Sequence, residues 1–463
     1  MSLAPGSTRP HPRLVFAPTP GLRIWRTSLK LVFVLAIPIL SACADRVTDP
    51  TSSASLSSSA SSTRSFPTTL ATVGWQEQER TLVASHPATM SPVNAARAYA
   101  LLGVAQYGAV VDADSRVDAD ATLKDEGQGF GVGGRSRFEA QRGAIAGASA
   151  QVLSYLFPDA ATVLEQRLTD EGNVGPGGAH PYFTRGVAVG RAFGEVMIAW
   201  AHADGFSNTA CTPPVTSTCW FGDYPTAGSG HWTRNGGATG PPIAGPQFGA
   251  MRPYFLTSPA QFHPVPPPAL NSQEYADALT EVVSISNART DEQRDDARAW
   301  NLPQGTITAL GYWDRLAAQY IGEHNLDERA AAHVFALTNA AAMDAVIGCW
   351  EAKFTYFLIR PSQASAAVKL DPIINGVGIG LPNHPSYTSG HSCVSAAAGT
   401  VIEAFFPEHT TTVNGLVAAA GESRIRAGIH YRFDVVKGQE LGRSVAGWAI
   451  AYDRDRGLLA AVR

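Results

Sequence analysis

The segment KFTYFLIRP, residues 353–361, decides how this sequence is interpreted. It holds two cations, Lys353 and Arg360, seven residues apart in an otherwise apolar and aromatic stretch. Seven residues are close to two helical turns, so a helix through both would present them on one side, and Pro361 marks the expected helix end. Unpaired buried cations are costly, so the segment alone predicts either a bound anion or two separate surface salt bridges.

A second segment, HPSYTSGH at residues 384–391, directly precedes an apolar stretch with helical periodicity. Ser389, Gly390 and His391 would lie at the start of that helix, where free backbone N–H groups and the helix dipole favour an anion. The alternative is that Ser389 only caps the helix with its side chain.

The third segment is SRIRAGIHYRFD, residues 423–434. His430 and Asp434 are four residues apart, so in a helix the carboxylate can hold the imidazole and fix its tautomer. Arg424 adds a guanidinium, which is suited to a tetrahedral oxyanion. A surface helix with charge pairs is the alternative for this segment alone. Together, the three segments have the groups needed to bind a phosphate-sized oxyanion and to act on it.

In this order and at these spacings, the segments resemble the signature shared by vanadium-dependent haloperoxidases and the type-2 phosphatidic acid phosphatase superfamily. The positions that match it are Lys353, Arg360, Pro361, Ser389, Gly390, His391, Ser423, Arg424, His430 and Asp434. Thr388 stands where the signature usually has proline, which removes no chemical group.

In the haloperoxidase branch, the resemblance implies that vanadate occupies the pocket and that phosphate competes for it. The groups that would hold its equatorial oxygens belong to Lys353, Arg360, Ser389, Gly390 and Arg424. His430 would supply the axial nitrogen to vanadium, and His391 would act as acid and base on the apical oxygen and on peroxide. Hydrogen peroxide and halide would then give hypohalous acid or its equivalent, which reacts with an unidentified organic acceptor.

Two other functions use the same pocket. In a phosphatase, His430 would attack a phosphate ester and become phosphohistidine, His391 would protonate the leaving alcohol and Asp434 would orient His430. A non-catalytic oxyanion-binding lipoprotein is the third possibility. The long helical region before Lys353 favours the haloperoxidase branch, because soluble acid phosphatases of the superfamily are short and its membrane phosphatases have several spanning helices.

Two positions bear on the halide. Trp350 lies three residues before Lys353, and His384 lies seven residues before His391. In the haloperoxidase family the latter position tends to be phenylalanine in chloride enzymes and histidine in bromide enzymes. His384 therefore favours bromide or iodide over chloride, unless it serves only as a hydrogen-bonding residue behind the site.

The rest of the chain predicts an all-α fold of helical bundles, two four-helix bundles by the resemblance. Ala-rich stretches with apolar residues at three- and four-residue spacing lie near 92–113, 136–156, 182–203, 272–287, 304–322, 327–357, 390–406, 413–427 and 434–452. Residues 204–268 contain twelve prolines, and their aromatic residues should pack on the body; these are Trp220, Phe221, Trp232, Phe248, Tyr254 and Phe255. We expect an N-terminal half over 67–268 and a C-terminal half over 269–463 that carries the site.

The N-terminus predicts export. Basic residues precede the apolar run 31–40, which is right for a signal peptide, and Leu40-Ser41-Ala42-Cys43 resembles a bacterial lipobox with Cys43 as the lipidated residue. An ordinary secretory signal with an incidental cysteine is the alternative. Residues 44–66 would form a flexible Ser/Thr-rich tether. The expected location is the cell envelope, on the periplasmic side or the outer, extracellular face, with membrane contact only through the lipid.

The remaining cysteines and the net charge predict the state of the thiols and the class of partner. Cys211 and Cys219, eight residues apart in a Pro/Gly-rich loop, are candidates for a local disulfide, and Cys349 and Cys393 for buried free thiols. The 463 residues carry a formal net charge of −4. Removing residues 1–43 lowers it to about −9, which argues against a nucleic-acid partner. A homo-oligomer is allowed by the resemblance.

Overall fold

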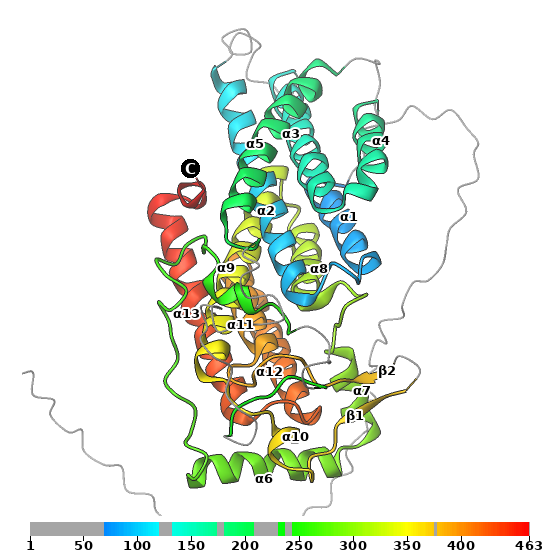
Figure 1. The fold of residues 1–463 in the computed structure, drawn as a ribbon. Helices are drawn as coiled ribbons and strands as arrows, with labels where there is room; N and C mark the ends of the chain where they lie inside the picture. Colours follow the sequence, from blue (N-terminus) through cyan, green and yellow to red (C-terminus); the bar gives the residue numbers. More distant parts are fainter. Residues whose placement is uncertain are drawn as a thin grey trace, which may run out of the picture. The chain divides into compact units, whose positions relative to one another are not determined.

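Long helices make up most of the protein, as the apolar periodicity predicts, and the all-α fold class is confirmed (Figure 1). The computed structural model describes residues 69–119, 132–173, 180–207, 230–236, 243–374 and 377–462. The predicted signal peptide, the lipobox with Cys43, the tether and the Cys211–Cys219 pair lie outside these residues and stay predictions.

One group of helices comes from the first part of the chain. It consists of α1 (Ala71–Ser85), α2 (Pro92–Ala119), α3 (Val132–Leu156) and α5 (Pro181–Ala203), with α4 (Ala161–Gly172) against α3. α3 and α5 pack especially closely. A Cβ at Gly186 would come within 2.2 Å of the Ala140 carbonyl oxygen, and one at Gly190 within 2.0 Å of the Ala144 oxygen. The small faces of these helices therefore allow the close packing that their composition predicts.

A second group surrounds the long helix α9. Its members are α8 (Thr308–Glu323), α9 (Glu328–Tyr356), α11 (Gly390–Phe405), α12 (Thr410–Arg426) and α13 (Arg432–Arg456). α9 packs against α2 of the first group as well as against α11 and α13, so the two groups share one continuous core. Within the described ranges α9 is the one helix long and apolar enough to cross a membrane, but 89% of its apolar window is buried.

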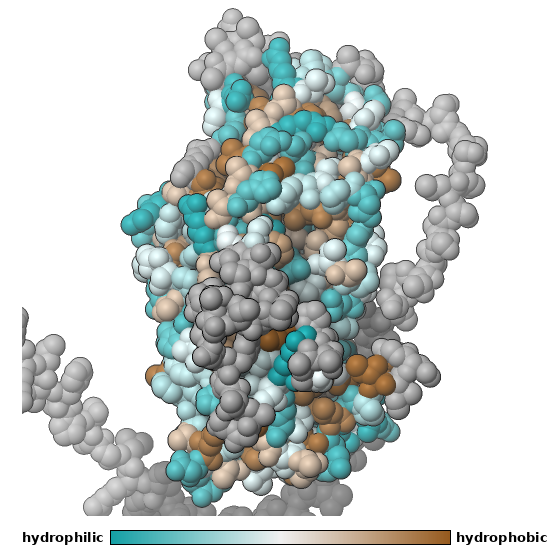
Figure 2. All heavy atoms as spheres, viewed as in Figure 1, coloured by the Kyte–Doolittle hydropathy of each residue, from teal (hydrophilic) through white to brown (hydrophobic). Residues whose placement is uncertain are grey.

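The surface agrees with a helix that is buried among others. On the face shown in Figure 2, hydrophobic residues are scattered among hydrophilic ones, and the coloured atoms form no broad apolar band. The apolar side chains of α9 therefore pack against neighbouring helices in the core.

Shorter elements cover the end of the second group where the predicted site lies. They are α6 (Gln273–Ala288), α7 (Asp291–Ala299), α10 (Pro361–Ala364) and a hairpin of β1 (Asp371–Ile374) and β2 (Val377–Ile379), which pair antiparallel. Within the described residues there are also four short 3₁₀ helices: η2 (Pro158–Ala160), η5 (Pro246–Ala250), η6 (Pro407–His409) and η7 (Leu458–Ala461). The apolar periodicity predicts neither the hairpin nor helices α1, α4 and α7.

The described part of the proline-rich region packs on the helices, as its aromatic residues predict. Trp232, Phe248, Tyr254 and Phe255 are buried, whereas Trp220 and Phe221 lie outside the described residues. The Asp344 carboxylate of α9 holds the segment by accepting the backbone N–H groups of Tyr254, Phe255 and Leu256 at 2.7, 2.8 and 3.1 Å. The same helix that anchors this segment also leads to the site.

Candidate functional site

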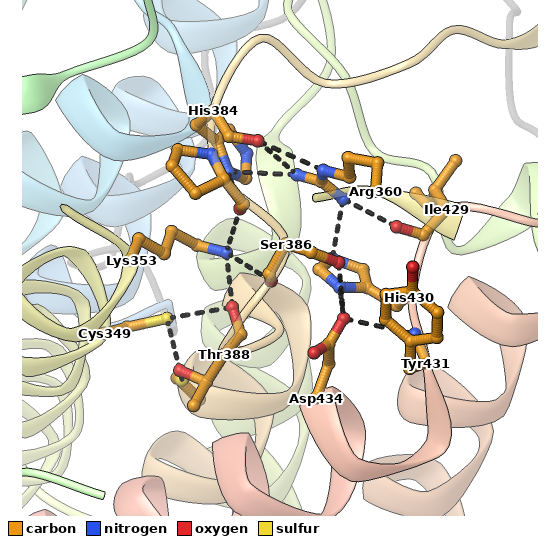
Figure 3. Close-up of polar contacts among 12 residues, drawn as sticks. Cys349, Lys353, Arg360, His384, Ser386, Thr388, Ile429, His430, Tyr431 and Asp434 are labelled. Atoms are coloured by element: carbon orange, nitrogen blue, oxygen red, sulfur yellow. Dashed lines mark hydrogen bonds and ion pairs between the residues drawn. The ribbon is translucent and has the colours of Figure 1, made fainter. Parts of the chain in front are cut away.

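The three sequence segments meet where helix ends converge (Figure 3). Lys353 lies in the last turn of α9, Ser389 is the residue before α11, and Asp434 lies in the first turn of α13. Arg424 comes from the last turn of α12, and His430 from the turn between α12 and α13. The structure therefore brings together the oxyanion-binding residues that the sequence predicts.

The local reasons for this convergence differ from those we expected. α9 ends at Tyr356, because Phe357 adopts a left-handed conformation with φ of 50°, and Arg360 is extended at the start of α10. The two cations therefore meet because the chain turns, and the prediction of one helix through both was wrong. His430 likewise precedes α13, so it reaches Asp434 across the start of a helix and not along it.

Lys353 holds the loop that leads into α11. Its buried ammonium group donates to the carbonyl oxygens of Pro385 and Ser386, each at 3.0 Å, and to that of Thr388. Burial lowers the pKa of Lys353 to about 8. The lysine is thus satisfied by neutral acceptors alone.

The two guanidinium groups also bind mainly neutral acceptors. Arg360 donates to the carbonyl oxygens of His384 at 3.0 and 3.1 Å and of Ile429 at 2.8 Å. Arg424 donates to the Ser423 hydroxyl at 2.9 Å and the Ala297 carbonyl at 2.7 Å. Burial lowers the pKa of Arg360 to about 10 and that of Arg424 to about 9, so both remain charged at neutral pH.

The charges of the pocket do not balance. Lys353, Arg360 and Arg424 are at most 1% exposed, and within the described ranges none of them forms an ion pair. The Asp434 carboxylate lies close enough to interact electrostatically with Lys353 and Arg360. Its hydrogen bonds, however, are made with Ser386, His430 and the Tyr431 N–H. Because buried charges need compensation, the excess of cations predicts a bound anion.

We expect the affinity of this pocket for sulfate to fall as the pH rises through about 8. Lys353 loses its proton there in the anion-free protein, which removes one of the three cations. The lowered pKa of Lys353 changes the folding stability in the opposite direction. An unfolded lysine has a pKa of about 10.4, so between about pH 8 and 10 the unfolded chain binds more protons, and stability rises with pH.

Calorimetric titration with sulfate between about pH 6 and 8.5 measures this effect, since sulfate keeps its charge over that range and Arg424, with a pKa of about 9, stays mainly protonated. Lys353→Arg is the control, because a guanidinium keeps its proton to higher pH than the lysine, so the affinity should fall much less. An equal fall in wild type and Lys353→Arg would contradict the role of Lys353.

His430 is oriented by a carboxylate. Its Nδ1 lies 2.8 Å from Asp434 Oδ2, and the same oxygen accepts the Ser386 hydroxyl at 2.6 Å and the Tyr431 N–H at 3.1 Å. Burial and the nearby cations hold the pKa of His430 well below its usual value. Because the carboxylate accepts a hydrogen bond from Nδ1–H, Nε2 keeps its lone pair, and this atom faces Arg360 Nη1 at 3.1 Å.

Within the three site segments, three buried side-chain polar atoms have no hydrogen-bond partner among the described residues: Ser389 Oγ, His391 Nε2 and Asp434 Oδ1. Ser389 is the N-cap residue of α11, but its side chain makes no capping hydrogen bond. The simple capping alternative is therefore wrong. Burial, reinforced by Arg424, lowers the pKa of His391 to about 3, so this imidazole is neutral in the anion-free pocket.

Trp350 and His384 form one wall of the site. Their ring centroids are 5.1 Å apart, and Trp350 donates from Nε1 to the Ala244 carbonyl oxygen at 2.9 Å. His384 Nδ1 lies 3.0 Å from Arg360 Nη2, and burial with the nearby cations lowers its pKa well below the usual value. His384 therefore hydrogen-bonds to Arg360, as expected if it serves as a hydrogen-bonding residue behind the site. Its effect on halide preference stays a prediction.

Thr388, which stands in place of the usual proline, lies against two thiols. Its hydroxyl is 3.2 Å from Cys349 Sγ and 3.4 Å from Cys393 Sγ. Both cysteines are free and buried, which confirms the sequence prediction. With threonine in place of proline, the backbone carbonyl oxygen of residue 388 still accepts a hydrogen bond from Lys353.

Two residues of the site were not predicted from the sequence. Ser386 shares the Asp434 carboxylate with His430, and its position inside the second segment could have indicated a role. Asn301, whose Oδ1 is 3.4 Å from Arg424 Nη1, follows α7 at a place that no sequence signal connects with the site.

The pocket at these helix ends combines three buried cations with a carboxylate-oriented imidazole and a serine hydroxyl that has no partner among the described residues. Residues 330–458 match the family model of the PAP2 superfamily. This stretch contains all three sequence segments, so the part of the chain that is similar to the superfamily is the part that builds the pocket. No curated protein matches the sequence significantly.

Several solved structures share the fold. A bacterial vanadium-dependent iodoperoxidase matches with a TM-score of 0.63 and 22% identity, over 82% of this chain and 96% of its own. The holo form of a bacterial vanadium-dependent chloroperoxidase matches with a TM-score of 0.59 and 15% identity, over 83% and 96%. An apo form matches with a TM-score of 0.57 and 15% identity, over 79% and 93%. The likeness therefore includes the helices that precede the PAP2-superfamily region.

Proposed function

We propose that this protein is a vanadium-dependent haloperoxidase that oxidises halide with hydrogen peroxide to hypohalous acid or its equivalent. The observation that carries the proposal is the set of three buried cations without an ion-pair partner in the described chain. The shared fold with vanadium-dependent iodo- and chloroperoxidases supports it. The PAP2-superfamily match supports oxyanion chemistry at the same residues.

The residues fit vanadate, a tetrahedral oxyanion in solution. Lys353, Arg360 and Arg424 supply the charge, and Ser389 Oγ supplies a hydroxyl with no other partner among the described residues. The first N–H groups of α11, beginning at Gly390, have no acceptor within their own helix. When bound, vanadate would supply the Lewis-acid centre that polarises hydrogen peroxide toward attack by halide.

The chain itself would bind, orient and move protons. The three cations and the Ser389 hydroxyl hold oxygens in a site where buried charges act strongly. His430 presents an unprotonated Nε2 because its proton sits on Nδ1, which donates a hydrogen bond to Asp434. His391 Nε2 is available to take and return a proton. A bound anion would offset the Arg424 charge, which helps to depress the pKa of His391, and would make its protonation easier.

Halogenation tests the proposal directly. The purified protein, freed of phosphate, is incubated with vanadate, hydrogen peroxide and bromide, and bromination of a phenol dye is followed. A parallel reaction contains a chromogenic phosphate ester without vanadate. Vanadate-dependent bromination supports the haloperoxidase, whereas ester hydrolysis without bromination would replace it with the phosphatase, in which His430 Nε2 is the nucleophile. Binding of vanadate without either reaction would indicate an oxyanion-binding protein.

Replacing His384 with phenylalanine should raise the ratio of chloride to bromide turnover. The change removes a nitrogen that contacts Arg360 and keeps an aromatic ring beside Trp350. It also follows the tendency of the family toward phenylalanine in chloride enzymes. Steady-state kinetics with both halides measure the ratio, and Trp350→Phe shows whether any change of this wall has the same effect. An unchanged ratio in His384→Phe would leave His384 as a hydrogen-bonding residue only.

We also propose that the protein is exported and lipid-anchored through Cys43 at the bacterial cell envelope. The apolar run 31–40, the lipobox-like sequence and the Ser/Thr-rich residues 44–66 support this location. In cells fed a labelled fatty acid, the full chain should become labelled and Cys43→Ala should not. Labelling of Cys43→Ala would contradict the anchor.

A further inference from the structure

A cluster of two histidines and two glutamates lies far from the oxyanion pocket. His324 closes α8, Glu408 and His409 form part of the turn η6 between α11 and α12, and Glu323 is the last residue of α8. The pocket lies at the first residue of α11 and this cluster just after its last. Sixteen helical residues rise about 24 Å, so the two sites are separate.

The ligand atoms converge on one carboxylate. His324 Nε2 is 2.6 Å and His409 Nε2 is 3.8 Å from the same oxygen, Glu408 Oε1, and His409 Nε2 is 3.4 Å from Glu323 Oε2. The three atoms from His324, Glu408 and His409 all lie within 4.8 Å of one another. Ligand atoms of a tetrahedral zinc ion are separated by about 3.4 Å, so small side-chain rotations complete the geometry.

Aromatic neighbours hold the two imidazoles in place. The His409 ring stacks on Tyr320 with centroids 3.7 Å apart and an interplanar angle of 6°. The His324 ring lies 5.1 Å from Phe406, and the two imidazoles are inclined at 82° to each other. Fixed rings with converging Nε2 atoms reduce the ordering that a metal ion would otherwise have to impose.

We propose that His324, Glu408 and His409 bind one divalent transition-metal ion of the zinc class, with Glu323 or a water molecule as the fourth ligand. Two imidazoles and a carboxylate are a common zinc ligand set, whereas calcium and magnesium prefer oxygen ligands alone. The ion would join the end of α8 to the turn between α11 and α12. Its role would be structural, at a distance from the oxyanion chemistry.

Calorimetry on the full chain, treated with a chelator and then dialysed, tests the site with zinc chloride. We expect one saturable site with an affinity on the order of micromolar or tighter. His324→Gln and His409→Gln should each weaken zinc binding at least about tenfold. Zinc should also raise the melting temperature of wild type by several degrees, and calcium or magnesium should not.

His333→Gln is the matched control, because His333 is also partly exposed and paired with an acid, Asp453, at 2.8 Å. Glu408→Gln keeps both aromatic contacts and provides a second test if His409→Gln folds poorly. X-ray absorption at the zinc edge should show nitrogen and oxygen neighbours. Unchanged zinc affinity in His324→Gln and Glu408→Gln, sulfur ligands at the zinc, or no saturable binding in wild type would overturn the proposal.

Discussion

Replacing His430 with alanine should abolish vanadate-dependent turnover and weaken vanadate binding by at least about 100-fold, since even residues that only support metal ligands have effects of 10- to 100-fold. His430 Nε2 is an unprotonated imidazole nitrogen beside the three cations, and Asp434 fixes this tautomer. Alanine leaves no atom that can replace it. Vanadate binding measured by calorimetry and bromination measured with a phenol dye test both parts of the expectation.

Two further variants separate this role from a general effect on folding. Asp434→Asn keeps the size of the side chain but removes the carboxylate that orients His430, and it should lower turnover by roughly 10- to 100-fold. His333→Ala removes a histidine with a similar carboxylate contact outside the pocket and should change neither measurement. Tight vanadate binding by a folded His430→Ala protein would contradict the proposal that His430 helps to hold vanadate.

Replacing Arg424 with methionine should weaken oxyanion binding by about 100-fold, which equals about 2.7 kcal/mol. Arg424 is buried, has no ion-pair partner among the described residues and donates to neutral acceptors. An anion in the pocket would gain one of its three charge-assisted contacts from this side chain. Titration with vanadate and with phosphate should show the same loss, because under the proposed function the two anions share the site.

The same change should affect the anion-free protein much less. Removing a buried charge relieves its desolvation cost, which offsets the hydrogen bonds lost at Ala297 and Ser423, so we expect the free energy of unfolding to change by only about 1–2 kcal/mol. Arg426→Met is the matched control, because Arg426 lies two residues away and pairs with Asp296 at 2.9 Å. Equal anion affinity in wild type and Arg424→Met would exclude Arg424 from the pocket.

Much of the site could be predicted from the sequence, because its residues lie in three short segments with fixed internal spacing. Lys353, Ser389 and His430 carry chemistry that these spacings identify. The turn that brings Arg360 to them could not be predicted, because it depends on the left-handed conformation of Phe357, a residue with no preference for it. Asn301 was missed because it reaches Arg424 through tertiary packing alone.

The fold class followed from the apolar periodicity, but individual helices did not. α1 is the clearest example, because its buried face includes Gln76, Glu79 and Arg80. Polar residues at core positions remove the three- and four-residue apolar pattern on which the prediction of helices depends. Their burial is decided by neighbours such as Gln106, which accepts a hydrogen bond from Gln76 across 30 residues of sequence.

If the pocket binds an anion as proposed, the three unbalanced cations would also link the lifetime of the protein in the cell to its supply of ligand. A chain with an empty pocket keeps the full cost of burying them, so it opens more often and is exposed to proteases for a larger fraction of the time. Under the proposed function, phosphate would compete for the same groups and would protect newly made chains until vanadate binds. Scarcity of the metal would then limit activity without limiting the amount of intact protein.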